Sequence, residues 1–196
     1  MIILGITGGI GCGKSVVVSL LQTMGIPTYI ADDEAKRLTN TSPVIRSSLI
    51  AHFGQDIFVD NILNKQKLAS LIFGNADHLK LVNSIIHPIV ATDFVQWSES
   101  HKTHRCVVME AAILFESGFN RFMDVIWSVY APLEVRIRRI MHRGNTSYES
   151  VIQRINNQLP DEEKCRLADD VIYNDDAEAI LPQVEFLLKK YSIDIF

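Results

Sequence analysis

The sequence predicts an α/β fold built on a parallel, five-stranded sheet flanked by helices. Two observations predict it. Short apolar segments rich in β-branched residues alternate with longer helical patterns along the 196-residue chain, as they do in sheets that are covered on both faces. The first apolar segment, Ile2–Thr7, runs straight into a glycine-rich turn that leads into a helical pattern, which is the order of elements around a P-loop.

Each expected strand is a short and mostly apolar segment. The strands are expected at Ile2–Thr7, Thr28–Ala31, Cys106–Met109, Val125–Tyr130 and Val171–Tyr173. Helical periodicity, with proline near a start and glycine after an end, accounts for most of the remaining chain. The helices are expected at Lys14–Met24, Asp33–Leu38, Pro43–Phe53, Asn64–Phe73, Ala76–Ile86, Pro88–Glu99, Leu133–His142, Ser147–Asn157, Asp161–Leu167 and Ala177–Tyr191.

Residues 41–102 lie between the second and third expected strands and show no strand signal of their own. We therefore expect a mostly helical insertion there. Within it, His87 and Pro88 are expected to separate two helices, because proline disrupts a helix interior. This break is expected to shape a pocket for an acceptor molecule, although a lone histidine more often has a structural role.

Composition excludes several classes of protein. The net charge is −4, with no basic excess, so a nucleic-acid partner is not expected. The three cysteines are widely spaced and form no C-x-x-C pair, which argues against a disulfide framework or a zinc site and fits a reducing cytoplasm. No apolar run is long enough to span a membrane, and the start of the chain is expected to be a buried strand, not a signal peptide.

The strongest motif is the segment Gly8–Ser15, which satisfies the P-loop pattern G-x-x-x-x-G-K-[ST]. Its glycines let successive backbone N–H groups turn toward a phosphate, and the following helix adds its positive N-terminal end. Lys14 is expected on the β- and γ-phosphates of ATP, and the Ser15 hydroxyl on Mg²⁺. The residues expected to bind the nucleotide are Gly9, Ile10, Gly11, Cys12, Gly13, Lys14 and Ser15. The alternative is an ordinary glycine-rich turn.

Two acidic residues follow expected strands. Asp32 comes directly after the second strand, where it could accept a proton from an attacking hydroxyl or help to bind the metal. The alternative is that Asp32 caps the next helix, a role for which Asp33 is also suited. Glu110 follows the third strand, which we expect to lie beside the first, and is expected to act on the substrate and metal side of the site. Its alternative is a solvated strand end.

A basic cluster lies farther along the chain. It consists of Arg136, Arg138, Arg139, His142, Arg143 and Arg154. Arg139 and Arg143 are four residues apart and share a helix face, and Gly144 is expected to end that helix and act as a hinge. Arginines over a transferring phosphoryl group neutralise its charge, so Arg139 and Arg143 are candidate catalytic residues. The alternative is a solvated basic helix.

Several segments together resemble the dephospho-coenzyme A kinase family. Residues 5–15 are similar to that family's G-L-T-G-G-I-G-S-G-K-[ST], and residues 31–36 resemble the end of its D-A-D-x-x-A-[RK]. The later matches are residues 81–88 with L-x-x-[IL]-x-H-P, 114–118 with L-L-F-E-[ST]-G, 154–158 with R-[ILM]-x-x-Q and 168–174 with A-D-x-V-I-x-N. The later segments make the resemblance specific, because many families share the P-loop.

The resemblance implies a single P-loop kinase domain with a helical acceptor-binding insertion at about 41–102 and a lid at about 136–165. It implies transfer of the γ-phosphate of ATP to the 3′-hydroxyl of the dephospho-coenzyme A ribose, the last step of coenzyme A biosynthesis. Asp32 matches the family's general base, the lid arginines fall near Arg139, Arg143 and Arg154, and Asn174 lies in the segment that the family places by the adenine. The resulting substrate-binding set is Asp32, His87 and Glu110.

The chain departs from the family pattern at three places. Ile30 replaces the first acid of D-A-D, residues 111–113 replace a segment that often holds proline, and Cys12 replaces a common serine. Because a helix N-terminus and a lysine favour a thiolate, we expect Cys12 to be reactive when the site is empty and shielded by ATP. The alternative is a buried cysteine that acts as a small apolar filler.

Three other functions compete with this interpretation. A nucleoside monophosphate or sugar kinase would use the same loop. A P-loop GTPase would need an N-K-x-D motif, and that tetrapeptide does not occur in the sequence. An ATP-binding module without transfer activity would need neither Asp32 nor the arginine-rich segment.

Overall fold

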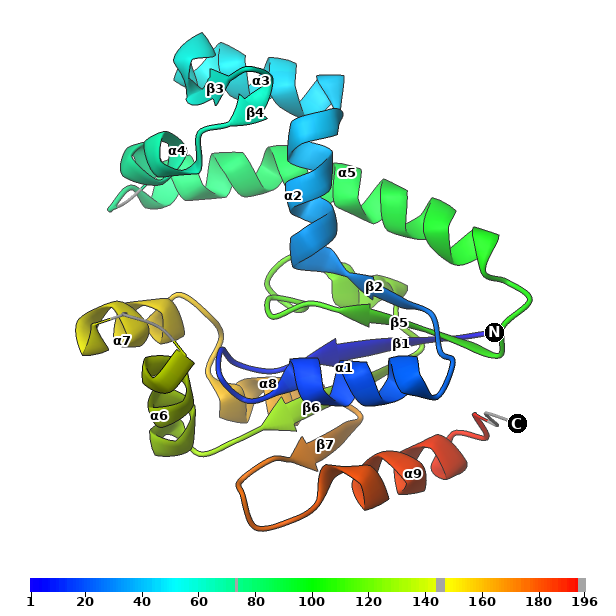
Figure 1. Cartoon of the computed structure of the whole chain (residues 1–196). Coiled ribbons are helices and arrows are strands. Elements are labelled where there is room, and N and C mark those ends of the chain that lie inside the picture. The colour runs from blue at the N-terminus through cyan, green and yellow to red at the C-terminus, as the bar shows by residue number, and fades with distance from the viewer. Residues whose placement is uncertain (73, 144–146, 194–196) are drawn as a thin grey trace. The chain divides into compact units, whose positions relative to one another are not determined.

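The computed structural model describes residues 1–72, 74–143 and 147–193, which divide into two units. The first unit comprises the chain up to Ile30 and from His101 onward, and the second comprises Ala31–Ser100 (Figure 1). The second unit overlaps the insertion expected at 41–102 but begins about ten residues earlier, because it includes the whole helix that follows the second strand.

The first unit is built on the predicted sheet. Its five strands are β1 (Ile2–Thr7), β2 (Thr28–Ile30), β5 (Cys106–Glu110), β6 (Val125–Tyr130) and β7 (Asp170–Tyr173). Their order is β2-β5-β1-β6-β7, and every neighbouring pair is parallel. The predicted fold class is therefore confirmed, with β1 at the centre. Since parallel strands end at the same edge, β1 brings the P-loop to the edge where β5 also ends.

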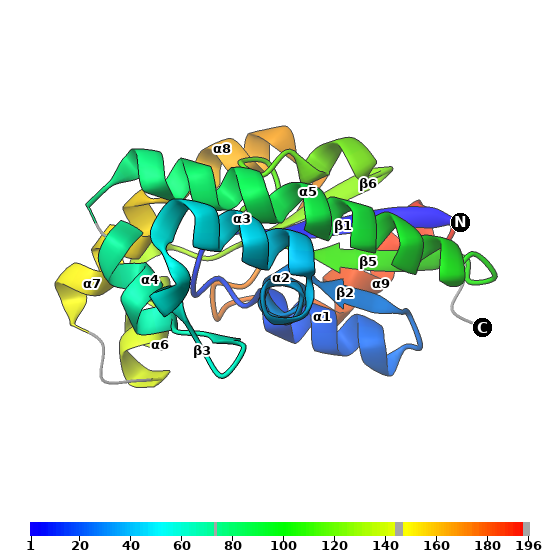
Figure 2. The ribbon, with the colours of Figure 1, turned by 90° about the horizontal axis from the view of Figure 1, so that it is seen from above.

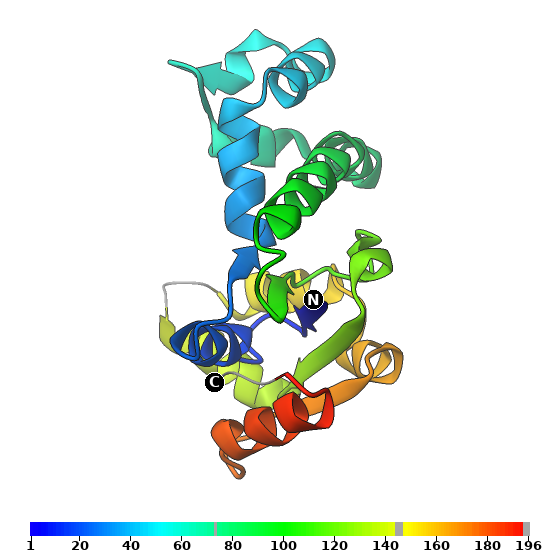
Figure 3. The ribbon, with the colours of Figure 1, turned by 90° about the vertical axis from the view of Figure 1, so that its right-hand side faces the viewer.

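Helices cover both faces of this sheet. Helices α1 (Lys14–Thr23), α8 (Asp161–Leu167) and α9 (Ile180–Lys190) contact its strands. The unit also contains α6 (Leu133–Arg143) and α7 (Tyr148–Asn156), which pack against each other, and a short 3₁₀ turn, η2, at Phe119–Phe122. In Figure 3, α1 and α9 lie on one face and α8 on the other. The core between α1, α9 and the strands includes Leu4, Val17, Leu21, Trp127 and Leu187. The last helix starts later than the expected Ala177 because the Asp175 side chain accepts the N–H groups of Ala177 and Glu178 in a turn.

The outer edge of the sheet at β7 is closed by a side chain. The Gln183 side chain, from α9, accepts the backbone N–H of Tyr173 at 2.8 Å and donates to the Tyr173 carbonyl at 2.9 Å. Because β7 is an edge strand, these backbone groups face away from β6. Gln183 therefore supplies the hydrogen bonds that a further strand would make there.

The second unit is mostly helical, as predicted. Its helices are α2 (Ala31–Thr41), α3 (Pro43–Phe53), α4 (Lys65–Ile72) and α5 (Ala76–Ser100). Both α2 and α3 pack against α5, and Figure 2 shows α3 running alongside it. The predicted end of the fourth helix, Phe73, lies outside the described residues.

Two predictions for this unit are wrong. A 3₁₀ turn, η1 (Gln55–Ile57), leads into a small antiparallel hairpin of β3 (Phe58–Val59) and β4 (Ile62–Leu63). The hairpin turns at Asp60 and Asn61, which both have positive φ, the conformation that a tight turn requires. Pro88 does not separate two helices, because α5 continues through it. Buried residues on both sides of Pro88, such as Val82 and Phe94, keep the helix in register and outweigh the lost hydrogen bond.

Candidate active site

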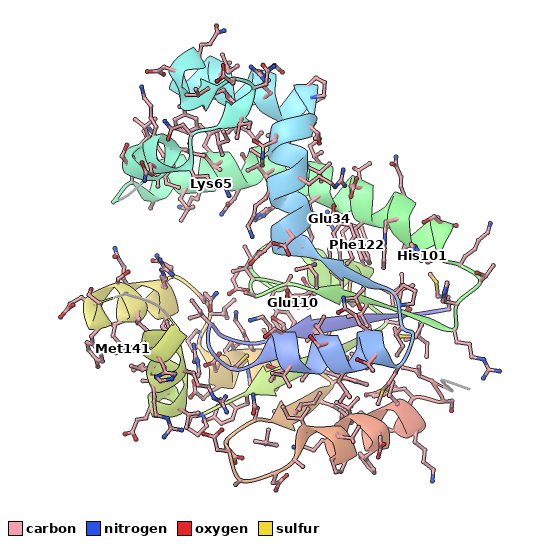
Figure 4. The ribbon with its side chains drawn as sticks, in the orientation of Figure 1. Glu34, Lys65, His101, Glu110, Phe122 and Met141 are labelled. Atoms are coloured by element: carbon pink, nitrogen blue, oxygen red, sulfur yellow. The ribbon has the colours of Figure 1, made fainter. Side chains whose placement is uncertain are left out.

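The P-loop joins β1 to α1, and its lysine lies over the loop. Lys14 Nζ donates to the carbonyl oxygens of Gly8 at 3.0 Å and Gly9 at 3.4 Å. It also lies 3.8 Å from Glu110 Oε1. Strand register explains this proximity, because Ile6 of β1 pairs with Glu110 at the end of β5. Figure 4 labels Glu110. The expectation that Glu110 lies beside the P-loop strand is confirmed, and the two side chains form a mostly buried ion pair there.

Ser15 lies in the first turn of α1, directly after Lys14, and is exposed. Its hydroxyl suits a single protein contact to Mg²⁺, which usually keeps several waters and takes further ligands from substrate phosphates. A dedicated cluster of three or more His, Cys, Asp or Glu side chains that could hold a metal is not found among the described residues. The donor set therefore fits a metal that is bound together with a nucleotide.

Asn174 joins the P-loop to the end of β7. Its Nδ2 donates to the Cys12 carbonyl at 2.7 Å. Gly13 makes this approach possible, since its φ is +98° and a Cβ there would lie 2.0 Å from Asn174 Nδ2. The Asn174 side chain thus supports the loop in this structure, and its expected contact with adenine stays a prediction.

Arg139 lies next to Asn174. Its guanidinium donates to the Asn174 carbonyl at 3.0 Å and to Asn174 Oδ1 at 3.2 Å, and it pairs with Asp176. Arg139 is therefore linked through Asn174 to the P-loop. Arg143 ends α6, but its side chain and Gly144, the expected hinge, lie outside the described residues.

Cys12 does not face the nucleotide side of the loop. Its side chain is fully buried in the core with Val17 and Leu21, and its N–H donates to the Gly9 carbonyl at 3.2 Å. Reactive cysteines need partial exposure. The expectation of a reactive Cys12 is therefore wrong for this conformation, and the thiol acts as the small apolar filler that we gave as its alternative.

Sequence reasoning missed two residues that hold the loop. Arg136 is 4% exposed, and its Nε donates to the Ile10 carbonyl at 2.8 Å. Gln158 Oε1 accepts the Ile10 N–H at 3.1 Å. Arg136 was only one member of the basic cluster, and it is not on a solvated face. The available signal for Gln158 was its place at the end of the R-[ILM]-x-x-Q segment.

A buried lysine was also missed. Lys164 of α8 is fully buried, and its ammonium donates to Glu116 Oε1 at 3.0 Å and to the Ala112 carbonyl. Burial lowers the pKa of Lys164, and the hydrogen bond to Glu116 partly opposes that shift. Glu116 also accepts the N–H of Leu159 at 2.8 Å. This group ties the segment after β5 to the start of α8, and it explains why the loop keeps a defined shape without the family's proline.

Asp32 and His87 belong to the second unit. Asp32 lies in the first turn of α2, two positions after β2 ends at Ile30, and it is exposed, so its expected place just after the second strand is confirmed. Asp33 lies in the same turn and pairs with Lys36 at 2.7 Å. Because α2 begins at Ala31, both acids lie inside the helix, and neither holds the N-cap position that we gave as the alternative. His87 lies on α5, where burial lowers the pKa of its imidazole. The first unit brings together the P-loop, Glu110, Arg139 and Asn174.

Among the described helices, none combines the length and apolar character needed to cross a bilayer.

The chain is similar to known proteins in both sequence and fold. The chain matches the dephospho-CoA kinase family over residues 2–179. It is 50% identical over 182 residues to a dephospho-CoA kinase of Bacteroides fragilis, covering 92% of this chain and 88% of that protein. A crystal structure of a Thermus thermophilus protein superposes with a TM-score of 0.79 and 33% identity, covering 97% of this chain and 96% of that one. The fold is also that of a dephospho-CoA kinase from Campylobacter jejuni, with a TM-score of 0.70, 22% identity, and coverage of 97% and 96%.

Proposed function

The chain belongs to the dephospho-CoA kinase family, and on this premise we propose that it transfers the γ-phosphate of ATP to the 3′-hydroxyl of the dephospho-CoA ribose. This reaction gives coenzyme A. The observation that carries the proposal is the complete P-loop, in which the Lys14 ammonium lies 3.8 Å from Glu110 at the carboxyl edge of a parallel sheet. That edge is where open α/β sheets bind their ligands.

The P-loop residues bind the nucleotide in this proposal. Lys14 exchanges its contacts with the loop carbonyls for the β- and γ-phosphates, where its charge counters the charge of the transferring group. The loop N–H groups and the N-terminus of α1 stabilise the same phosphates. Ser15 would hold Mg²⁺, which when bound neutralises phosphate charge. Glu110 pairs with Lys14 and orients its ammonium group.

The remaining candidates act on the acceptor and on the transition state. The exposed Asp32 carboxylate takes the proton from the attacking 3′-hydroxyl, and His87 contacts the acceptor. Arg139 and Arg143 neutralise the phosphoryl group from the lid at about 136–165. For Arg139 this requires exchange of the Asp176 carboxylate for a phosphate. The proposal also places the enzyme in the cytoplasm, which its free cysteines support, without a nucleic-acid or membrane partner.

A panel of acceptors tests the proposal. ADP release from Mg-ATP would be followed with dephospho-CoA, with AMP, with a sugar and with water alone, and the acceptor product would be identified by mass. We expect ADP release only with dephospho-CoA, together with a product that has gained one phosphoryl group. Equal release with AMP would favour a nucleoside monophosphate kinase, and equal release with water alone would favour an NTPase switch.

A further inference from the structure

Ile10, near the tip of the P-loop, is held at both of its backbone polar groups by residues from much later in the chain. Arg136 Nε donates to its carbonyl at 2.8 Å, across 126 sequence positions. Gln158 Oε1 accepts its N–H at 3.1 Å, across 148 positions. Arg136 lies on α6 and Gln158 follows α7. The backbone at this point of the loop is therefore fixed from outside the loop.

The Arg136 guanidinium is held in place by a buried carboxylate. Arg136 is 4% exposed, Asp161 at the start of α8 is 7% exposed, and the two form an ion pair. The pair lies directly against the loop, because a Cβ on Gly9 would lie 2.3 Å from Arg136 Nη2 and 2.3 Å from Asp161 Oδ1. Only glycine fits at position 9 while this pair is present.

This pair is poorly arranged for stability alone. Asp161 Oδ1 is buried and has no hydrogen-bond partner among the described residues. A buried ion pair with an unsatisfied oxygen carries a desolvation cost that a well-packed apolar pair would avoid. The guanidinium, however, does something that an apolar side chain cannot do, since it donates to the Ile10 carbonyl.

We propose that Arg136 is a positioning residue for phosphate binding, which fixes the Gly9–Ile10 backbone from one side while Gln158 fixes it from the other. Asp161 orients the guanidinium. This inference rests on the proposed function in one respect only, namely that the loop receives the phosphates of ATP. Because Arg136 and Arg139 lie on the same helix, α6, the hydrogen bond from Arg136 to Ile10 also ties the helix that carries Arg139 to the phosphate-binding loop.

The experiment separates positioning from stability. In Arg136→Met/Asp161→Leu, an apolar pair replaces the ion pair, so the melting temperature should stay close to that of the parent. The donor to Ile10 is still missing, so the Kd for ATP should rise about 10- to 100-fold, as expected for the loss of a hydrogen bond from a charged group. Gln158→Met keeps the side-chain length and should raise the Kd by a smaller factor. The exposed pair on α8, changed in Arg166→Met/Glu163→Leu, is the matched control and should alter neither quantity.

Hydrogen exchange of the peptide that contains Ile10 gives a readout that does not depend on ATP. We expect faster exchange in Arg136→Met/Asp161→Leu and in Gln158→Met than in the parent and the control pair. Arg136→Lys, which keeps the charge beside Asp161, gives a second test if the double variant folds poorly, and it should show the same faster exchange. The inference is wrong if Arg136→Met/Asp161→Leu has the melting temperature, the hydrogen-exchange rate and the ATP affinity of the parent. In that case the pair has only a structural role. If the parent protein phosphorylated another acceptor in place of dephospho-CoA, the proposed function would be overturned. The positioning role of Arg136, measured by hydrogen exchange and ATP affinity, would still hold.

Discussion

The P-loop and the helical unit of residues 31–100 are held by polar contacts of very different reach. At the P-loop, Arg136, Gln158 and Asn174 bond to backbone groups that are 126, 148 and 162 positions away. In the helical unit, side-chain hydrogen bonds mostly join positions three or four apart, and a longer one, from Arg37 to Asp93, spans 56. The phosphate site therefore depends on distant parts of the chain. The helical unit presents its candidate residues, Asp32 and His87, from locally stabilised helices.

This difference predicts which properties of the protein a substitution in each region should change. A change at a residue that supports the P-loop should alter the shape of the site and the stability of the first unit together. A change at Asp32 should alter only the chemistry of that side chain. The following variants test the contrast, in order of decreasing effect.

Lys14→Ala should have the largest effect and reduce the rate of transfer at least about a thousandfold, because no neighbouring side chain replaces its charge on the β- and γ-phosphates. The measurement is kcat for ADP release with dephospho-CoA, with the melting temperature as a check on folding. Transfer within a factor of two of the parent would remove the P-loop from the mechanism.

Asp32→Asn should lower kcat about 10²- to 10⁴-fold while the Kd for ATP stays at the parental value, because the amide keeps the shape of the side chain but cannot accept a proton. Asp33→Asn, in the same turn of α2, is the matched control and should leave kcat near the parental value. An unchanged kcat with a raised ATP Kd would instead make Asp32 a binding residue.

Lys164→Met should lower the free energy of unfolding by about 3 kcal/mol, because it leaves Glu116 and the Ala112 carbonyl without their buried partner. Urea unfolding would measure the change. Lys190→Met breaks a more exposed pair with Asp170 and should lower the free energy of unfolding much less. Lys164→Met/Glu116→Leu should recover most of the loss. Equal losses in Lys164→Met and Lys190→Met would contradict the importance of the buried long-range contact.

His87→Gln should have the smallest effect on stability, and only in acid. Burial lowers the pKa of His87 below its ordinary value of 6.5. As the pH falls below 6.5, the unfolded chain takes up the proton first, so the free energy of unfolding decreases until the folded-state pKa is reached. Glutamine does not titrate, so the variant should lose less stability than the parent as the pH falls below 6.5. The same loss in parent and variant would show that His87 is not responsible, and His52→Gln on α3 provides the exposed control.

The sequence was sufficient for the five strands and for the P-loop, because buried parallel strands are short apolar segments and the P-loop has a fixed spacing. It was not sufficient for the β3–β4 hairpin, whose strands have two residues each and leave Val59 and Ile62 56% and 62% exposed. No buried apolar pattern marks such strands. Pro88 was misread because local preference predicts a break there, whereas packing along α5 keeps the helix whole.

The candidate site was predictable only where the chemistry depends on the side-chain type at a known spacing. Arg136 and Gln158 bond to the backbone of Ile10, and neither side-chain type by itself reveals a backbone partner. For Gln158, the available signal was its place in the R-[ILM]-x-x-Q segment. Their distance along the chain adds to the difficulty, because only the folded sheet brings α6 and the segment after α7 to the loop. The burial of Cys12 was missed for a similar reason, since the direction in which a loop side chain points is set by the packing around it.

The Gln183 side chain at the outer edge of β7 also affects self-association of the protein at high concentration. An open strand edge is a template on which another chain can add a strand, and growth of this kind leads to aggregation. At Tyr173 the backbone donor and acceptor are already taken by Gln183 of the same chain. A second molecule would have to displace Gln183 before it could extend the sheet at this position. One glutamine on α9 therefore protects the fold from association through its exposed edge at Tyr173.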